Sequence, residues 1–546
     1  MSKKFLVIGS GISALGSIKA LNKEGIYPDV YDTSIEIEEH LKDIKEKFRN
    51  SNQKDWKESD LKNTLLKFQD NENFFSIPKK TFFSSSFFYG ESQAEDDIDS
   101  EGILPPFSYA LGGLAEGWGA AFLPPAKDDL KEWVYSYKDI CKNFKEILQD
   151  MHVTGERDDL EKVFPIMKDD LHSLKYSSES LNLLKKIKKY NKNPNILIGK
   201  SRLLLDTMEE KFIPYFADSL VPKKQLNSFD RLKIEMQRDW HWQVHDAIYK
   251  PSLEMKMLSE EGKINLYSGR RVTDIVINLD NTLNVYFITS SVKKLSTTSY
   301  DKVFLAAGCI NSSRIILNSK KLFNKKLKVK TRGGFLLPAI SLRKTNPSLK
   351  IKNTMPDFFI EIFNKLFPNW IHVQVSLQNE LFENRLNWIS KKIPLKAFFQ
   401  SIKERVFIVF VNLNSNEAGH YELFLDPNHV SDYGPRLNTT YIKKSIKPIK
   451  KLNLVFQIFL IFIKANALVS PFSKSNAGTY HVGGSFPMRR KPMKWNETNY
   501  LGELEEMKNL HLVDSSTFPT LPGTTIGLLS KVMAYTITKE ALKDTL

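Results

Sequence analysis

Apolar runs and glycines alternate over the first 32 residues and predict a strand, a helix and a second strand. The continuous apolar run at residues 4–9 is typical of a strand buried in a parallel sheet. Apolar residues then recur at near-helical spacing from Ile12 to Leu21, and Gly25 follows as a C-terminal stop. Residues 28–32 form the second strand. This order predicts the opening unit of a doubly wound α/β domain.

Strand patterns return in the middle of the chain. Four segments alternate in the strand manner and are separated by turn residues, namely 264–269, 272–280, 283–291 and 301–308. They predict an antiparallel meander followed by another buried strand. Residues 331–474 mix strand and helix patterns with many aromatic side chains, which suits a second, sheet-containing domain. Residues 34–102 show little period and predict a surface insertion.

Composition narrows the classes of function. The net charge is +16, but the basic residues are scattered among 63 acidic ones and form no compact block with aromatics, which argues against nucleic-acid binding. Cys141 and Cys309 lie far apart without metal-type spacing, so we expect no disulfide framework and a reducing, cytoplasmic setting. The amino-terminal strand leads directly into a glycine loop, which leaves no room for a secretory signal. His241 and His245 lack a third ligand, so no metal site is expected.

The longest apolar run extends from Leu454 to Ile463. Ten residues at about 1.5 Å rise span about half of a bilayer core, so this run cannot be a simple transmembrane helix. Two interpretations stay open. The run is either a helix buried in the core or a weak peripheral membrane contact, which Lys450, Lys451 and Lys464 would favour.

The glycine loop after the first strand carries a dinucleotide-binding pattern. Gly9 allows the tight turn, and Gly11 lets the backbone approach a pyrophosphate at the positive end of the helix. Ala14 fills the third position that this pattern permits, and Asp32 ends the second strand where a carboxylate can accept ribose hydroxyls. The residues expected around the cofactor in this loop are Gly9, Ser10, Gly11, Ile12, Ser13 and Ala14.

A second glycine-rich stretch runs from Tyr109 to Pro125. It has too many glycines for a plain helix and is too apolar for a free loop, so it predicts a buried backbone that approaches a ligand. Trp118 within it either stacks near that ligand or fills the core.

Four motifs occur in order along the chain, and together they resemble the glucose–methanol–choline family of FAD-dependent oxidoreductases. Besides the glycine loop, they are "AAGCINSS" from Ala306, "HVGGSFPM" from His481 and "VDSSTFPTLP" from Val513. The positions that match the family in the second and fourth motifs are Ala306, Ala307, Gly308, Asn311, Ser312, Val513, Asp514, Ser516, Pro519 and Pro522.

This resemblance implies FAD as cofactor and a mixed α/β fold, in which a Rossmann-type FAD-binding domain is joined to a sheet-containing substrate domain. Gly112 and Gly113 would lie beside the isoalloxazine, and Val272 would touch the adenine through its backbone. The other implied cofactor contacts are Trp118, Ala307, Gly308, Asp514 and Thr525. The expected division of the chain is a discontinuous FAD domain, 1–130 with 196–330 and 479–546, and a substrate domain, 131–195 with 331–478.

His481 is the expected catalytic base. The family pattern His-x-x-Gly-Thr/Ser-x-x-Met is filled here by His481, Gly484, Ser485 and Met488, and the resemblance places this histidine over the flavin. Oxidation of an alcohol requires removal of the hydroxyl proton as the hydride leaves for the flavin. An imidazole with a pKa of about 6.5 is suited to accept that proton near neutral pH.

Thr525 departs from the family, which has Asn or a second His eleven residues after the aspartate that Asp514 matches. A threonine hydroxyl can bind a substrate oxygen but cannot act as a base. His481 then works alone, the substrate sits differently, or the chemistry is impaired. Thr524 takes the position if the register slips by one residue.

The expected function is oxidation of a CH–OH group in a sugar, polyol or other alcohol, with an unknown electron acceptor. Two alternatives remain on the same fold. One is a flavin-containing binding or assembly protein with a degenerate site, and the other is a flavoenzyme of another reaction type.

Overall fold

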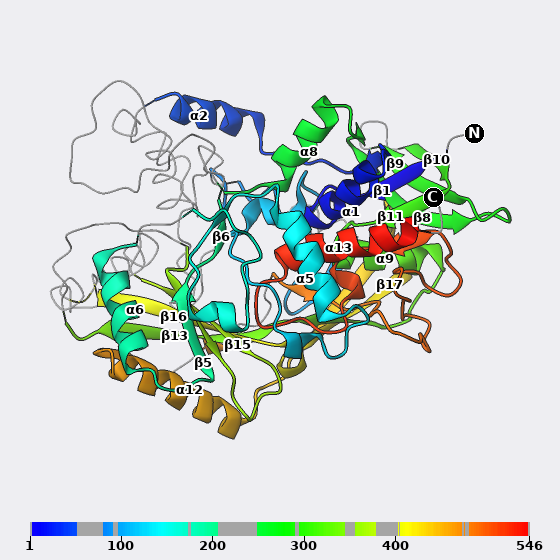
Figure 1. The fold of residues 1–546 in the computed structure, drawn as a ribbon. Coiled ribbons are helices and arrows are strands. Elements are labelled where there is room, and N and C mark those ends of the chain that lie inside the picture. The colour runs from blue at the N-terminus through cyan, green and yellow to red at the C-terminus, as the bar shows by residue number, and fades with distance from the viewer. Residues whose placement is uncertain are drawn as a thin grey trace.

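The computed structural model describes most of the 546-residue chain (Figure 1). The described residues are 3–51, 80–83, 85–90, 97–172, 176–205, 248–289, 294–343, 355–377, 402, 405–471, 474–475 and 480–543. His241 and His245, expected to hold no metal, lie outside them.

A five-stranded parallel sheet forms the core of one half of the molecule. Its order is β22-β11-β1-β2-β7, and every neighbouring pair runs parallel. The strands are β1 (Phe5–Ile8), β2 (Asp29–Tyr31), β7 (Asn265–Tyr267), β11 (Lys302–Leu305) and β22 (Leu510–Leu512). The predicted opening unit is confirmed, because helix α1 (Ile12–Lys23) connects the adjacent strands β1 and β2.

The carboxyl-terminal helix α13 (Gly527–Leu542) packs along α1 (Figure 1). Gly16 permits the close approach, since a Cβ at this position would collide with the backbone carbonyl of Lys531. The hydroxyls of Ser17 and Thr538 are hydrogen-bonded across the interface at 2.8 Å. The last residues described in the chain therefore complete the domain that the first residues begin.

The antiparallel meander differs from the predicted one. It consists of β8 (Arg270–Ile277), β9 (Leu283–Thr289) and β10 (Lys294–Tyr300). The segment predicted as its first strand, now β7, instead extends the parallel sheet beside β2. Strand β10 was missed because it is a mostly polar, exposed edge strand without an apolar stripe.

A mixed five-stranded sheet lies next to α9 (Cys309–Ser319), and its order is β21-β12-β17-β18-β3. Its strands are β3 (Ile98–Glu101), β12 (Leu327–Thr331), β17 (His420–Ser431), β18 (Gly434–Ile442) and β21 (Val482–Gly483). The pairing of β21 with β12 sets Val482 opposite Thr331. This register brings the His481 segment to the end of β12.

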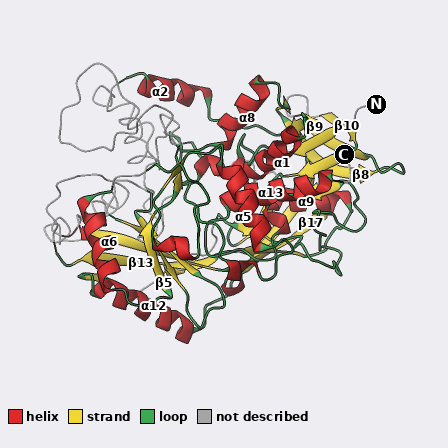
Figure 2. Ribbon diagram, viewed as in Figure 1, coloured by secondary structure: helices red, strands yellow, loops and turns green. Residues whose placement is uncertain are grey.

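The second half of the molecule is built on a seven-stranded antiparallel sheet (Figure 2). Its strands are β5 (Ile196–Lys200), β13 (Gly333–Ser341), β14 (Phe358–Ile362), β15 (Ile371–Ser376), β16 (Val406–Leu413), β19 (Ala467–Val469) and β20 (Lys474–Ser475). Alternate side chains on one face pack under α6 (Ser178–Tyr190) and α12 (Pro448–Ile463). The expected second, sheet-containing part is therefore present.

Short elements connect and cover these sheets. They are α2 (Glu39–Arg49), α5 (Tyr137–Leu148), α8 (Pro251–Glu260), β4 (Val153–Thr154), β6 (Leu203–Leu204) and the 3₁₀ turns η2 (Gly113–Gly117), η3 (Lys127–Leu130), η4 (Asp159–Lys162), η6 (Ser415–Glu417) and η7 (Ser515–Thr517). None of the helices in the described ranges has the length and apolar character needed to cross a bilayer.

Two elements lie across the expected division of the chain. Strand β5, assigned to the FAD domain, pairs with β14 in the seven-stranded sheet. Helix α5, assigned to the substrate domain, packs against α13. Such placements depend on long-range pairing, so a boundary drawn from local composition does not capture them. The division itself stays a prediction.

Candidate active site

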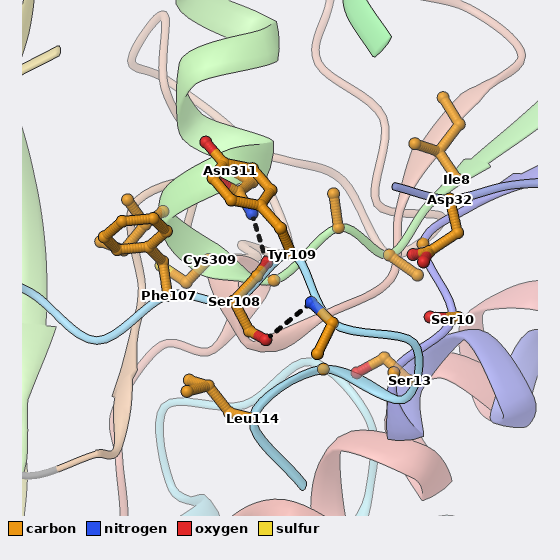
Figure 3. A pocket seen from close by; sticks show the side chains of 18 of the residues that line it. Ile8, Ser10, Ser13, Asp32, Phe107, Ser108, Tyr109, Leu114, Cys309 and Asn311 are labelled. Carbon is orange, nitrogen blue, oxygen red and sulfur yellow. Dashed lines mark hydrogen bonds between the residues drawn. The ribbon is translucent and has the colours of Figure 1, made fainter. Parts of the chain in front are cut away.

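A large cavity opens at the carboxyl ends of β1 and β11 (Figure 3). The space that it encloses, together with adjoining open solvent, is about 1120 Å³. It is lined by most of the residues that the sequence predicted around a cofactor, namely Gly9, Ser10, Gly11, Ile12, Ser13, Asp32, Gly112, Gly113, Val272, Ala307 and Gly308. Segments from both ends of the chain, from Ile8 to Ser530, therefore meet around one space.

Each of the two glycine-rich segments contains a glycine with positive φ at the cavity. Gly9 has φ +107°, and a Cβ there would lie 2.5 Å from the carbonyl oxygen of Ala306. Gly112 has φ +89°, and its N–H donates to the Ser10 hydroxyl at 2.9 Å. The two glycine-rich segments predicted to approach a ligand are thus joined directly to each other.

Asp32 occupies the end of β2 at the cavity wall. Its carboxylate accepts hydrogen bonds from the N–H of Ser34 at 2.6 Å and from the Ser34 hydroxyl at 3.0 Å. Burial nevertheless raises the pKa of this carboxyl to about 6. Arg270 lies beside it, with its guanidinium 4.0 Å from the ring centre of Tyr267 and 4.5 Å from that of Tyr31.

Two further arginines line the cavity, and the sequence analysis missed both. The guanidinium of Arg271 is paired with the buried carboxylate of Asp97 and donates to the Tyr109 hydroxyl at 2.7 Å. Arg314 lies 3.4 Å from the same carboxylate, and burial lowers the pKa of its guanidinium. For Arg271 the available signal was the pair of arginines that opens strand β8, ahead of the apolar positions Val272 and Ile275.

The "AAGCINSS" segment turns from β11 into α9 at the cavity wall. The Asn311 amide donates to the Ser108 carbonyl at 3.0 Å, and the Ser108 hydroxyl accepts from the Ala110 N–H at 3.1 Å (Figure 3). Asp514 does not line the cavity. It lies behind the helix start, where its carboxylate accepts from the Gly308 N–H at 2.9 Å.

His481 lies at the edge of the cavity, between the lining residues Tyr480 and Val482. Its carbonyl accepts from the N–H of Arg332 at 3.3 Å and from the Thr331 hydroxyl at 3.2 Å. Burial, and next the nearby guanidinium of Arg332, hold the pKa of this imidazole well below its usual 6.5. The side chain is therefore held in its neutral, proton-accepting form.

Arg332 connects the His481 segment to the carboxyl-terminal turn. The backbone N–H of Arg332 donates to the His481 carbonyl. Its side chain donates from Nη1 to the carbonyls of Gly523 at 3.0 Å and Thr524 at 3.2 Å. The guanidinium is buried, and this burial lowers its pKa to about 9. Sequence analysis missed Arg332, although an arginine followed by two glycines between apolar strands is a detectable signal.

A row of polar side chains crosses the seven-stranded sheet on the face away from α6 and α12. Glu361, His372 and Asn412 lie directly opposite one another on β14, β15 and β16. Because paired residues of an antiparallel sheet project from the same face, their side chains are neighbours. The imidazole Nδ1 of His372 is 2.5 Å from the Glu361 carboxylate, and its Nε2 is 3.0 Å from the Gln374 amide. We refer to Glu361, His372 and Asn412 as the polar row.

The carboxyl-terminal turn rests on the polar row. A Cβ at Gly523 would lie 2.9 Å from the carbonyl of Asn412 and 3.4 Å from the N–H nitrogen of His372, so only glycine fits there. Thr524 and Thr525 follow, and Ile526 lines the cavity. Among the described residues, the hydroxyls of both threonines, Oε2 of Glu361 and Nδ2 of Asn412 are buried without a hydrogen-bond partner. Buried polar atoms in this state call for an explanation, and none of these four residues is among those that line the cavity.

Four predicted cofactor contacts lie outside the cavity lining, namely Asp514, Thr525, Ala14 and Trp118. Ala14 is buried in the core between α1 and the parallel sheet, and Trp118 lies outside the cavity lining. The Trp118 indole N–H donates to the Tyr249 carbonyl at 2.8 Å, and its ring packs against Gly527 at the start of α13. A contact of any of these four residues with a cofactor stays a prediction.

The residues around the cavity fit a flavin dinucleotide. A Cβ at Gly11 would meet only the Gly112 carbonyl, at 3.8 Å, so the loop leaves room exactly where the backbone must approach a pyrophosphate. Asp32 supplies an acceptor for ribose hydroxyls, and the N-terminus of α1 faces the same space. The described residues contain no cluster of His, Cys, Asp and Glu side chains that could hold a metal ion.

The fold is shared with FAD-dependent oxidoreductases. A structure of such an enzyme from Chaetomium thermophilum, in complex with a substituted butanamide fragment, superposes with a TM-score of 0.57 at 10% identity, over 100% of both chains. Pyridoxine 4-oxidase from Mesorbium loti superposes with a TM-score of 0.53 at 10% identity, over 99% of each chain. No protein-family model and no curated protein sequence matches the chain. The expected fold class is therefore confirmed by the similarity to these solved structures, although the sequences are only 10% identical.

Proposed function

We propose that the protein is an FAD-dependent oxidoreductase that oxidises a CH–OH group to a carbonyl. The observation that carries this proposal is that Arg332 joins the His481 carbonyl to the Thr524 carbonyl. Tyr480, Val482 and Ile526, which lie close to them along the chain, line the cavity that suits FAD. The structural neighbours, which include an oxidase of pyridoxine, support the same class of chemistry.

The cavity residues would hold FAD along its whole length. Asp32 would accept the ribose hydroxyls, the loop from Gly9 to Ser13 would bind the pyrophosphate, and Gly112 and Gly113 would lie beside the flavin ring. When bound, FAD supplies a two-electron acceptor for the hydride of the alcohol carbon.

His481 would accept the hydroxyl proton of the alcohol at an imidazole nitrogen. Burial and the neighbouring Arg332 lower the pKa of this imidazole, so a ring nitrogen is unprotonated at neutral pH, although the same effects make it a weaker base. Arg332 also fixes its position, because the same residue bonds both the His481 carbonyl and the carbonyls of the opposite turn.

The substrate would be rich in hydroxyl groups, as in a sugar or polyol. The Thr525 hydroxyl would bind the reacting oxygen, while Oε2 of Glu361 and Nδ2 of Asn412 would bind others. An acceptor and a donor offered together suit hydroxyls, which both donate and accept. Leaving these atoms unpaired in the bound state would cost binding energy, so they would select against apolar alcohols.

Anaerobic reduction of the purified holoenzyme tests the proposal. We expect a panel of sugars, polyols and simple alcohols to include at least one that bleaches the flavin absorbance. His481→Ala should retain the flavin and lower the reduction rate about 10²–10⁴-fold. Protein that contains no FAD overturns the proposal. If the protein contains flavin that no alcohol bleaches, the result supports the alternative of a binding or assembly protein. The threonine at position 525, which departs from the family pattern, favours that alternative.

A further inference from the structure

Helix α12 is apolar on two opposite sides. Its inner side, which includes Leu454, Ile458 and Phe462, packs on the seven-stranded sheet. On the outer side four large apolar side chains are exposed, namely Ile449 at 69%, Leu452 at 65%, Phe456 at 57% and Leu460 at 40%. Their spacing of three and four residues aligns them along one face of the helix. We call these four residues the outer stripe.

Basic residues surround the outer stripe. Exposed lysines lie before the helix, at Lys443, Lys444 and Lys447, and after it, at Lys464. From Lys443 to Lys464 the sequence contains six lysines and no acidic residue, and one of them, Lys450, is paired with Glu417. Helix α6, which covers the same face of the sheet, adds four more lysines against the single acid Glu179 (Figure 1).

We propose that α12 docks this protein on an anionic lipid surface, with the outer stripe inserted among the lipids. The stripe extends over about 17 Å at 1.5 Å per residue, which is too short to span a bilayer but long enough for a helix that lies in its plane. Lysines at both ends would contact the lipid headgroups, as in interfacial amphipathic helices. This proposal does not depend on the flavin chemistry.

Charge favours a membrane over a second copy of this chain as the occupant. A two-fold contact through the outer stripe would bring the lysine-rich ends of two identical helices together, and like charges there repel. The alternation of side chains also places the polar row away from α12. The row projects from the opposite face of the sheet, so docking through α12 would not cover it.

Vesicle flotation tests the proposal with the full-length protein. Wild-type protein should float with vesicles of phosphatidylcholine and phosphatidylserine, and at least about tenfold less with phosphatidylcholine alone or in high salt. The double variant Leu452→Ser/Phe456→Ser should lose binding about tenfold or more. Lys447→Glu/Lys464→Glu should lose it to a similar extent, because the lysine attraction is removed.

Leu279→Ser/Leu295→Ser is the matched control, since these two leucines are exposed at 107% and 56% but lie in the β8–β10 meander. It should bind vesicles like the wild type, and unchanged far-ultraviolet circular dichroism should show that every variant is folded. Three results would each overturn the proposal. Wild-type protein does not bind anionic vesicles, or the stripe and lysine variants bind them as well as the wild type does. The third is light scattering that shows a dimer which Leu452→Ser/Phe456→Ser dissociates, because the stripe is then a protein interface.

Discussion

The carboxylate of Asp514 accepts a hydrogen bond at 2.9 Å from the backbone N–H of Gly308, a residue 206 positions earlier in the chain. The same oxygen accepts from the Ser312 hydroxyl at 2.5 Å, and the other oxygen accepts from the N–H of Ser516 at 2.9 Å. One buried side chain thus joins the start of α9 to η7. Both segments line the cavity, through Gly308 and Ser515.

Asp514→Asn should therefore weaken the cofactor site without touching the cofactor. An amide presents an NH₂ group to a site in which every partner is a donor, so one buried N–H or hydroxyl is left unsatisfied at a cost of about 1–3 kcal/mol. We expect a lower free energy of unfolding in denaturant titrations and a lower flavin content after gel filtration. Asp280→Asn is the control, because Asp280 also accepts from a backbone N–H and a hydroxyl, both of Thr282, but is exposed. Equal losses in the two variants would contradict this role.

Two substitutions in the glycine loop should distinguish an effect on the stability of the fold from an effect on cofactor binding. Gly9→Ala should destabilise the fold itself by about 2–5 kcal/mol, because φ is +107° and the Cβ would lie 2.5 Å from the carbonyl oxygen of Ala306. Gly11→Ala meets no such obstacle and should change stability by less than about 0.5 kcal/mol. Its methyl group nevertheless enters the space proposed for the pyrophosphate.

Gly11→Ala should thus unfold like the wild type when both are flavin-free, yet bind FAD at least about tenfold more weakly, measured by fluorescence titration. Gly119→Ala is the control, since a Cβ there meets no atom within 4 Å. Undiminished FAD affinity of Gly11→Ala would show that the cofactor does not approach this loop.

The parts of the site that could be predicted are those that local patterns determine. The turn at Gly9 and Gly11 and the carboxylate at Asp32 belong to one strand–helix–strand unit, so their spacing in the sequence fixes their spacing in space. Strand β10 was not predicted because an exposed edge strand needs no apolar alternation, and its Ser and Thr residues are also common in turns.

The polar row and Arg332 could not be located in this way. Glu361, His372 and Asn412 meet only through the pairing of three strands, and Arg332 reaches Gly523 across 191 residues. Besides the arginine that precedes two glycines, the local clue is the alternation in β15, where His372 and Gln374 interrupt an apolar strand at every second position. That pattern indicates a polar second face, but it does not say which turn will cover it.

Flavin reduction should show an acid limb well below pH 6.5. Burial and Arg332 hold the pKa of His481 below its usual 6.5, so the neutral base persists as the pH falls through 6.5, and the rate declines only below that. Arg332→Gln removes a positive charge and should raise this pKa, so the acid limb moves towards 6.5. It should stay below 6.5, because burial is the larger cause.

The measurement is the pH dependence of the anaerobic reduction rate with the best substrate of the panel. Arg436→Gln is the control, since Arg436 pairs with Asp99 on β3 and does not line the cavity. A limb centred at 6.5 in the wild type, or an identical limb in Arg332→Gln, would contradict the proposed influence of Arg332 on the base.

Thr525→Val and Thr524→Val decide which threonine binds the substrate oxygen. Among the described residues both hydroxyls are buried without a partner, so replacing either by an isosteric methyl group should stabilise the substrate-free protein by about 1 kcal/mol. Only the hydroxyl that binds the reacting oxygen should also affect turnover. We expect Thr525→Val to raise the melting temperature and lower kcat/KM about tenfold, the equivalent of one hydrogen bond. Thr524→Val should raise the melting temperature alone. The reverse result would move the oxygen-binding role to Thr524. Unchanged turnover in both variants would mean that neither threonine binds the reacting oxygen and that His481 acts on the hydroxyl without them.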